Sequence, residues 1–182
     1  MSSVLVVSGS PSPGSRTGAV VSLVEQALAS CGCEVRALHV RRLPVLSLIT
    51  EDLRDPVISD AVGAVLRADG VVVVSPVYRA AHSGLVKALV DLLPEKALRG
   101  RPVLPVANGG AQGHLVAMDY ALGPLLAVKG ADSVLAGEFV LDQHIRGGSV
   151  AEERAVGLRL AVQRFGEVVR NASGNRRLRI AG

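Results

Sequence analysis

The segment from residue 71 to residue 94, VVVVSPVYRAAHSGLVKALVDLLP, constrains the fold more than any other part of the chain. It begins with a run of valines, passes through a short loop that contains Tyr78, and continues at Ser83-Gly84 into an amphipathic stretch. A continuous valine run is typical of a strand that is buried on both faces, as strands of parallel sheets are. The loop after such a strand lies at its carboxyl end, where open α/β sheets bind ligands. The segment therefore predicts an α/β protein with a ligand-binding loop at Pro76-Val77-Tyr78.

The rest of the chain repeats this alternation of strand and helix. Parallel neighbours need helical crossovers, and these crossovers are right-handed. The pattern therefore predicts a doubly wound, five-stranded parallel sheet with helices on both faces, in the flavodoxin-like order 2-1-3-4-5. The expected strands are residues 4–8, 34–40, 71–75, 102–107 and 134–141, and the expected helices are 17–30, 56–66, 83–93, 112–129 and one that opens with the capping box Ser149-x-x-Glu152.

Composition limits the classes of function. With 182 residues, a single domain over residues 1–173 is expected. The net charge of +4 owes much to the terminal NRRLRIAG, so we expect a flexible basic tail at 174–182 and no nucleic-acid-binding stripe. The two cysteines, Cys31 and Cys33, are too few for a usual metal site, and no metal is predicted. The amino terminus lacks a charged and then apolar leader, and no apolar run approaches a membrane span, so a cytoplasmic protein is expected.

The first predicted strand is followed by a loop rich in small and hydroxyl-bearing residues, Gly9-Ser10-Pro11-Ser12-Pro13-Gly14-Ser15-Arg16-Thr17. At the start of a helix, such a loop offers a phosphate free backbone N–H groups, the positive helix end, hydroxyls and a guanidinium. The pattern matches neither the Rossmann nor the Walker motif. The alternative is an ordinary Ser/Pro/Gly turn with a helix cap.

Two further loops lie at the carboxyl ends of predicted strands. Backbone groups of Pro76-Val77-Tyr78 are placed to read the polar edge of a flat ring, with Tyr78 alongside; the alternative is a tyrosine that packs on its own domain. Asn108-Gly109-Gly110 ends the next strand, and its glycines permit close approach of a ligand to the backbone, although such a sequence alone is more often a turn. Together the three loops favour a phosphorylated, flat-ringed ligand, with flavin mononucleotide (FMN) as the leading candidate.

Three segments, GSPSPGSRT, SPVYRAAHSGLVKALVDLLPEKALRGRPVLP and NGGAQGHLVAMDYALGPLL, resemble the NAD(P)H-dependent FMN reductases. The resemblance is closest to the small reductases of two-component alkanesulfonate monooxygenase systems and spans about residues 4 to 140. It implies a flavodoxin-like fold, hydride transfer from NADPH or NADH to FMN, and delivery of reduced FMN to a separate monooxygenase.

The resemblance also implies site residues. Hydride passes between stacked rings, so no catalytic acid or base is nominated. Ser12 stands where relatives often carry arginine, and His82 where they often carry an aromatic residue. The residues implied for the FMN phosphate are Ser10, Ser15, Arg16 and Thr17, and those implied for the ring are Pro76, Val77, Tyr78, Asn108, Gly109 and Gly110.

The predicted helix over residues 112–129 contains a proline that affects Tyr120. Pro124 removes the hydrogen-bond donor for the Tyr120 carbonyl, which favours a kink or a single π-bulge around Tyr120. The resemblance implies that this helix packs at a homotetramer interface beside the flavin, although a dimer is also compatible. The alternative is a plain kinked core helix.

Two other functions compete with the reductase hypothesis. One is a quinone, azo-dye or chromate reductase that holds FMN tightly. The other is a non-enzymatic flavodoxin-like electron carrier, which a chain of net charge +4 fits poorly because flavodoxins usually present acidic surfaces to their partners. The choice between NADH and NADPH stays open, because no residue that reads the ribose can be singled out.

Overall fold

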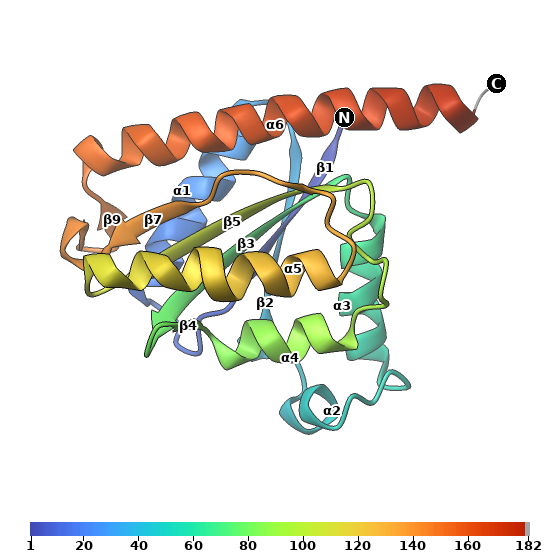
Figure 1. Cartoon of the computed structure of the whole chain (residues 1–182), viewed down its shortest axis with the longest axis horizontal. Helices are drawn as coiled ribbons and strands as arrows, with labels where there is room; N and C mark the ends of the chain where they lie inside the picture. The colour runs from blue at the N-terminus through green and yellow to red at the C-terminus, as the bar shows by residue number, and fades with distance from the viewer. Residues whose placement is uncertain (181–182) are drawn as a thin grey trace.

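The fold is built on a parallel sheet with the predicted strand order. The computed structural model describes residues 1–180, with side chains through Gly174. The strand order β2-β1-β3-β5-β6, with β7 also paired to β5, confirms the predicted 2-1-3-4-5 arrangement (Figure 1). These strands are β1 (Ser3–Ser8), β2 (Glu34–His39), β3 (Gly70–Tyr78), β5 (Pro102–Gly109), β6 (Ser133–Val134) and β7 (Glu138–Leu141).

Helices cover both faces of this sheet, and the alternation of side chains along the strands explains why. In β1, Val4 and Val6 face one hydrophobic cluster, whereas Leu5 and Val7 face the other. The first cluster packs under α1 (Arg16–Ser30) and α6 (Glu152–Ile180). The second packs under α3 (Pro56–Arg67), α4 (Gly84–Leu92) and α5 (Gly123–Val128). Figure 1 shows α4 and α5 on the other side of the sheet from α6. Because both of their faces are buried, the central strands β1, β3 and β5 are mostly apolar.

Local signals fix the ends of the early helices. Ser15 caps α1, since its side chain accepts from the Gly18 N–H, and Gly32 follows that helix with φ of 75°. Asp55 caps α3 ahead of Pro56, since its side chain accepts from the Val57 and Ile58 N–H groups. The connector between β2 and α3 forms two short helices, η1 (Val40–Arg42) and α2 (Val45–Ile49).

The expectation that β3 ends at Ser75 is wrong. The strand continues through Tyr78 and turns back into β4 (Ala81–His82), with Val77 opposite His82 in an antiparallel hairpin. The two turn residues, Arg79 and Ala80, have φ of 49° and 60°, values that a two-residue hairpin turn requires and that glycine or asparagine adopts most readily. Pro76-Val77-Tyr78 is therefore a strand end held by pairing.

The fifth strand is interrupted, where the sequence predicts one strand over 134–141. The break between β6 and β7 lies beside Pro105 of β5. The Val103 carbonyl accepts from the Leu135 N–H, and alternate residues of a strand face the same edge. The backbone nitrogen of Pro105 therefore faces the fifth strand. Because proline has no N–H to donate, the pairing stops there.

The beginning of the last helix also differs from expectation. Ser149 does not cap α6; it pairs in a second hairpin made of β8 (Ile145–Arg146) and β9 (Ser149–Val150), after a short helix η4 (Asp142–His144). The α6 helix then continues without a break through Ile180, so residues 174–180 extend the helix beyond the predicted domain boundary at 173. Free movement of residues 174–182 stays a prediction. Although α6 has 29 residues, no helix within residues 1–180 combines the length and apolar character needed to cross a membrane.

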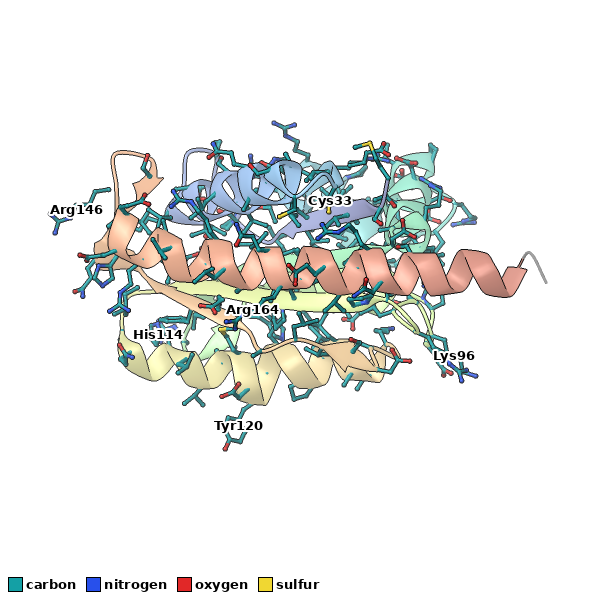
Figure 2. The ribbon with its side chains drawn as sticks, turned by 90° about the horizontal axis from the view of Figure 1, so that it is seen from above. Cys33, Lys96, His114, Tyr120, Arg146 and Arg164 are labelled. Atoms are coloured by element: carbon teal, nitrogen blue, oxygen red, sulfur yellow. The ribbon has the colours of Figure 1, made fainter. Side chains whose placement is uncertain are left out.

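The segment over residues 112–128 is helical but irregular. It consists of η2 (Gln112–Leu115), a π-helical turn η3 (Met118–Leu122) and α5. The π-turn includes Tyr120, which confirms the predicted irregularity upstream of Pro124. Figure 2 shows the Tyr120 side chain pointing away from the sheet, and it is 81% exposed.

Candidate functional site

The loop between β1 and α1 presents hydroxyl groups at the start of a helix. Ser10 is buried, and its Oγ lies 2.7 Å from Ser15 Oγ, which in turn accepts from the Gly18 N–H at 3.1 Å. Ser10 Oγ also accepts from the Ser12 N–H at 3.3 Å. These bonds hold the loop in one shape around the first turn of α1. The predicted phosphate residues Ser10 and Ser15 are thus brought together.

The first turn of α1 offers backbone donors to an anion. Among the described residues, no acceptor lies within hydrogen-bonding reach of the Arg16 or Thr17 N–H. Free N–H groups at a helix start, together with the positive end of the helix dipole, make an anion-binding site. The Arg16 side chain is 63% exposed beside this turn, and its Nη1 lies 3.4 Å from Asp142 Oδ2. The loop therefore fits a phosphate through backbone amides, hydroxyls and one guanidinium.

Two of the predicted residues do not face a ligand with their side chains. Thr17 and Asn108 are buried, and the Thr17 hydroxyl donates to Asn108 Oδ1 at 2.8 Å. The Asn108 amide then donates to Asp142 Oδ1 at 2.7 Å. The side chains of Thr17 and Asn108 thus connect the loop before α1 to the end of β5. Only the backbones of these two residues are available to contact a ligand.

Asp142 joins this network, and the sequence reasoning did not single it out. It follows β7 directly, at the same carboxyl edge of the sheet as the three loops. A signal was present: a polar residue at the carboxyl end of the last parallel strand belongs to the edge that binds ligands. The predicted fifth strand, 134–141, ends where β7 ends, so the sequence already placed Asp142 directly after that edge.

The two predicted ring-binding loops lie side by side. Pro76 of β3 pairs in register with Asn108 of β5, which sets the strand ends next to each other. Pro76 and Val77 are buried, whereas Tyr78 is 52% exposed at the beginning of the hairpin turn. Of these three residues only Tyr78 is exposed, so its ring is the part of this strand end that is open to a ligand.

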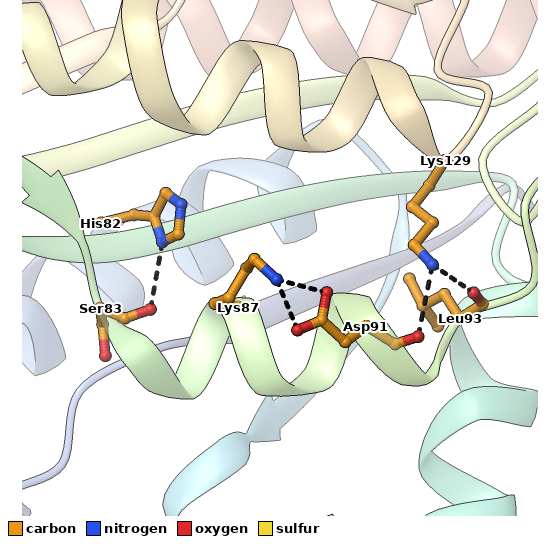
Figure 3. A network of polar contacts seen from close by, with 6 residues as sticks. All are labelled: His82, Ser83, Lys87, Asp91, Leu93 and Lys129. Atoms are coloured by element: carbon orange, nitrogen blue, oxygen red, sulfur yellow. Dashed lines mark hydrogen bonds and ion pairs between the residues drawn. The ribbon is translucent and has the colours of Figure 1, made fainter. Parts of the chain in front are cut away.

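The hairpin after β3 is fastened to α4 by hydrogen bonds. The Ser83 N–H donates to Ser75 Oγ at 2.9 Å, and the Ser83 side chain caps α4 by accepting from the Leu85 N–H. Figure 3 shows the adjacent contact between His82 Nδ1 and the Ser83 carbonyl, at 3.3 Å. His82 thus makes a local contact within its own hairpin.

Glycines allow the loops to approach their neighbours. A side chain at Gly9 would collide with Val86 of α4, and one at Gly109 would collide with His114 and Phe139. Gly110 is exposed and has nothing within 4 Å of the place where a Cβ would lie. The Gly110 backbone is therefore open to a ligand, as FMN binding requires.

Two buried polar atoms near this edge have no hydrogen-bond partner among the described residues: Ser8 Oγ at the end of β1 and His114 Nδ1 beside Gly109. Buried polar groups are nearly always hydrogen-bonded, so each of these atoms has room for a bond to a water molecule or to a polar ligand. The donors, the open Gly110 and these two atoms together fit a phosphorylated ring such as FMN.

Two hollows lie next to the loops. The larger, of about 520 Å³, is lined by Gln143, His144, Arg146 and residues of the second hairpin. The smaller, of about 230 Å³, is lined by Gln112, Phe139, His144 and Arg154, among others. None of the predicted FMN residues lines either hollow. The hollows therefore indicate a different place for a ligand than the polar groups of the three loops do. The convergence of anion donors and open backbone on the three loops is the more specific signal, because a hollow alone names no ligand.

Comparison with known proteins agrees with the chemistry of the loops. The model of the family described as "NADPH-dependent FMN reductase" matches residues 2–145. An FMN reductase (NADPH) of Pseudomonas putida strain KT2440 is 40% identical over 142 residues, which cover 78% of this chain and 72% of that protein. An NADH-dependent FMN reductase SfnF of Pseudomonas putida is 35% identical over 149 residues, covering 78% of this chain and 80% of that protein.

A solved structure supports the same conclusion. The apo form of an NADH:FMN oxidoreductase superposes with a TM-score of 0.85 at 33% sequence identity, covering 91% of this chain and 89% of that chain. The family match spans most of the chain, and these relatives are named for FMN, which the loops were expected to bind, and for the nicotinamide cofactor, which the resemblance implied. The chain therefore belongs to the NADPH-dependent FMN reductase family and is an NAD(P)H:FMN oxidoreductase.

Proposed function

We propose that this reductase binds FMN as an exchangeable substrate at the three loops and supplies reduced FMN to a separate flavin-dependent monooxygenase. When bound, FMN accepts a hydride from the nicotinamide and becomes the reduced flavin that such a monooxygenase consumes. The resemblance of the loop segments to reductases of alkanesulfonate systems supports a role in organosulfonate sulfur acquisition. A cytoplasmic homotetramer is part of the same proposal.

One observation carries the proposal: the predicted site is a surface rather than an enclosed cavity. Tyr78 at its ring side is 52% exposed and Arg16 at its phosphate side is 63% exposed. Gly110, at the end of the second ring loop, is exposed as well. A ligand at such a surface keeps one side toward solvent or a partner, so it is able to leave after reduction.

The chain's own residues have binding and orienting roles. The Arg16 and Thr17 N–H groups, the start of α1 and the Arg16 guanidinium would hold the phosphate. The paired ends of β3 and β5 would hold the ring edge through their backbones, with Tyr78 alongside. The Thr17–Asn108 bond keeps the two halves of the site at a fixed spacing. Stacking and position supply the catalysis, so no side chain is assigned as acid or base.

The test is to follow NADPH and NADH oxidation by the purified protein with and without added FMN, and to pass the FMN-loaded protein through gel filtration. We expect oxidation only with added flavin and loss of FMN on the column. Co-elution of stoichiometric FMN would favour the rival reductase with bound FMN. No oxidation with any flavin would favour the electron carrier.

A second experiment addresses the partner. The reductase is combined with an alkanesulfonate monooxygenase, an alkanesulfonate, NADPH and catalytic FMN, and released sulfite is measured. We expect sulfite only when both proteins are present. Failure with a monooxygenase that responds to chemically reduced FMN would remove the proposed delivery while leaving the reductase activity intact.

A further inference from the structure

We propose that Asp142 competes with the FMN phosphate for Arg16, and thereby makes the flavin easier to release. This inference rests on the proposed FMN site. It assigns the control of flavin affinity to a residue outside the three loops. The effect depends on the phosphate, so it distinguishes FMN from riboflavin.

The geometry places the carboxylate where a competitor has to be. Asp142 Oδ2 lies 3.4 Å from Arg16 Nη1, so the guanidinium expected to meet the phosphate already has an anionic partner. Among the described residues, Asp142 is the only carboxylate paired with Arg16. A phosphate bound at the start of α1 has to share or displace this partner.

The two members of the pair are held very differently. Asp142 is 22% exposed, and its second oxygen accepts from the Asn108 amide at 2.7 Å. Asn108 is fixed in turn by the buried Thr17 hydroxyl. Arg16, by contrast, is 63% exposed and has a long, flexible side chain. The carboxylate therefore stays in place while the arginine is free to move between Asp142 and a ligand.

A fixed carboxylate beside the phosphate site acts in two ways, both of which weaken phosphate binding. It offers Arg16 an ion pair that has to be given up, and it repels the negative charge of the phosphate. Neither effect applies to riboflavin, which has no phosphate. Asp142 should therefore lower affinity for FMN selectively, which suits an enzyme that hands its flavin to another protein.

The experiment measures FMN and riboflavin dissociation constants by quenching of flavin fluorescence, without nicotinamide. Asp142→Asn keeps an acceptor for Asn108 but removes the charge, so the FMN dissociation constant should fall about fivefold, as expected for an exposed ion pair. Riboflavin affinity should stay unchanged. Asp142→Glu, which keeps the charge, should stay close to the unmodified protein.

Asp91→Asn is the matched control. Asp91 also forms an ion pair at the surface, with Lys87 on α4 (Figure 3), but it lies eight residues after the Ser83 cap, about 12 Å along the helix from this edge of the sheet. Its replacement removes one negative charge and one surface ion pair without touching the site. FMN affinity should not change, which separates competition for Arg16 from a general effect of net charge.

Arg16→Ala completes the design. Loss of a charge-assisted bond should raise the FMN dissociation constant about tenfold or more. In Arg16→Ala, the further change Asp142→Asn should tighten FMN less than it does in the unmodified protein, because the shared partner is gone. Asp142→Ser, which also lacks the charge, serves if Asp142→Asn unfolds.

The idea is overturned if the neutral Asp142 variants bind FMN as before or more weakly, or if they tighten riboflavin equally. Failure of the proposed function has a different signature, namely unmodified protein that retains stoichiometric FMN through gel filtration or does not support sulfite release by the monooxygenase. The two failures are therefore distinguishable.

Discussion

Thr17 and Asn108 lie 91 positions apart in the chain, yet the Thr17 hydroxyl donates to Asn108 Oδ1 at 2.8 Å inside the protein. The bond joins the first turn of α1 to the last residues of β5. The phosphate loop precedes α1 and a ring loop follows β5, so this contact sets the distance between the two halves of the proposed FMN site. Both groups are buried, and neither has water available to replace its partner.

Thr17→Val should therefore destabilise the fold and disturb the site together. Valine keeps the shape of threonine but leaves the Asn108 carbonyl oxygen without its donor, at a cost of about 1–3 kcal/mol in the free energy of unfolding. Urea unfolding measures this loss. Thr17→Ser should restore most of it, because the hydroxyl returns.

Thr50→Val provides the matched control for that experiment. The Thr50 hydroxyl also donates a hydrogen bond, to the Leu46 carbonyl, but Thr50 is exposed at the C-terminal cap of α2. Water replaces an exposed partner, so the free energy of unfolding should change little. An equal loss in both variants would mean that the Thr17–Asn108 bond has no special role.

The contact of Gly9 with Val86 leads to a second prediction. A Cβ at position 9 would collide with Val86 Cγ2, so Gly9→Ala should lower the free energy of unfolding by about 1–3 kcal/mol. Val86→Ala alone leaves a cavity and should also destabilise. The double variant should lose clearly less than the sum, since the smaller residue 86 makes room for the new methyl group. Additive losses would show that the clash is relieved elsewhere.

Much of the fold follows from short-range signals in the sequence. The valine run of β3, the cap at Asp55 and the glycine after α1 each specify a local structure without help from distant residues. The order of strands then follows from the crossover rule. The π-turn at Tyr120 was predictable for the same reason, because Pro124 acts on a carbonyl four residues earlier in its own helix.

Two of the errors arose at short hairpins, and the omission of Asp142 arose where distant segments decide. The β3–β4 hairpin places Arg79 and Ala80 at positive φ, which their residue types disfavour, so the turn has no local signature. Ser149 has the spacing of a capping box, but pairing with Arg146 places it in β9. Asp142 gains its importance only from Asn108 and Arg16, which reach it across the sheet edge. Tertiary contacts of this kind leave no periodic pattern in the sequence.

Glu138 predicts a dependence of stability on pH. Burial raises the pKa of this carboxyl at the start of β7, and the nearby Arg164 opposes that effect only in part. A raised pKa means that the fold favours the protonated form, so its contribution to stability is present below the ordinary carboxyl pKa of about 4.3 and is lost as the pH rises through the folded value.

Glu138→Gln should accordingly raise the free energy of unfolding at pH 7, and this gain should shrink as the pH approaches 4. Urea unfolding at several pH values measures the difference. The exposed Glu167 on α6 gives the control, and Glu167→Gln should show no such trend. A gain for Glu138→Gln that is constant with pH would show that the side-chain charge is not its cause.

Tyr120 links the irregular helix to assembly. Its ring is 81% exposed and lies in the π-turn, so it contributes little to the stability of a single chain. An exposed aromatic ring with a polar tip suits a subunit interface. Tyr120→Ala should therefore weaken the proposed tetramer and change the residence time of reduced flavin, while urea unfolding of the monomer stays within about 0.5 kcal/mol of the unmodified protein.

Deletion of Tyr120 tests the π-turn itself. A single-turn π-bulge behaves as a one-residue insertion into an α-helix, so removal of one residue should restore the α-helical register upstream and disrupt activity more than the alanine change does. Leu160→Ala is the control, since Leu160 is a half-exposed apolar residue on α6, on the opposite face of the sheet. Sedimentation velocity and FMN titration are run on all four proteins. If both Tyr120 variants remain tetramers with unaltered flavin affinity and turnover, Tyr120 is an ordinary surface residue of its helix.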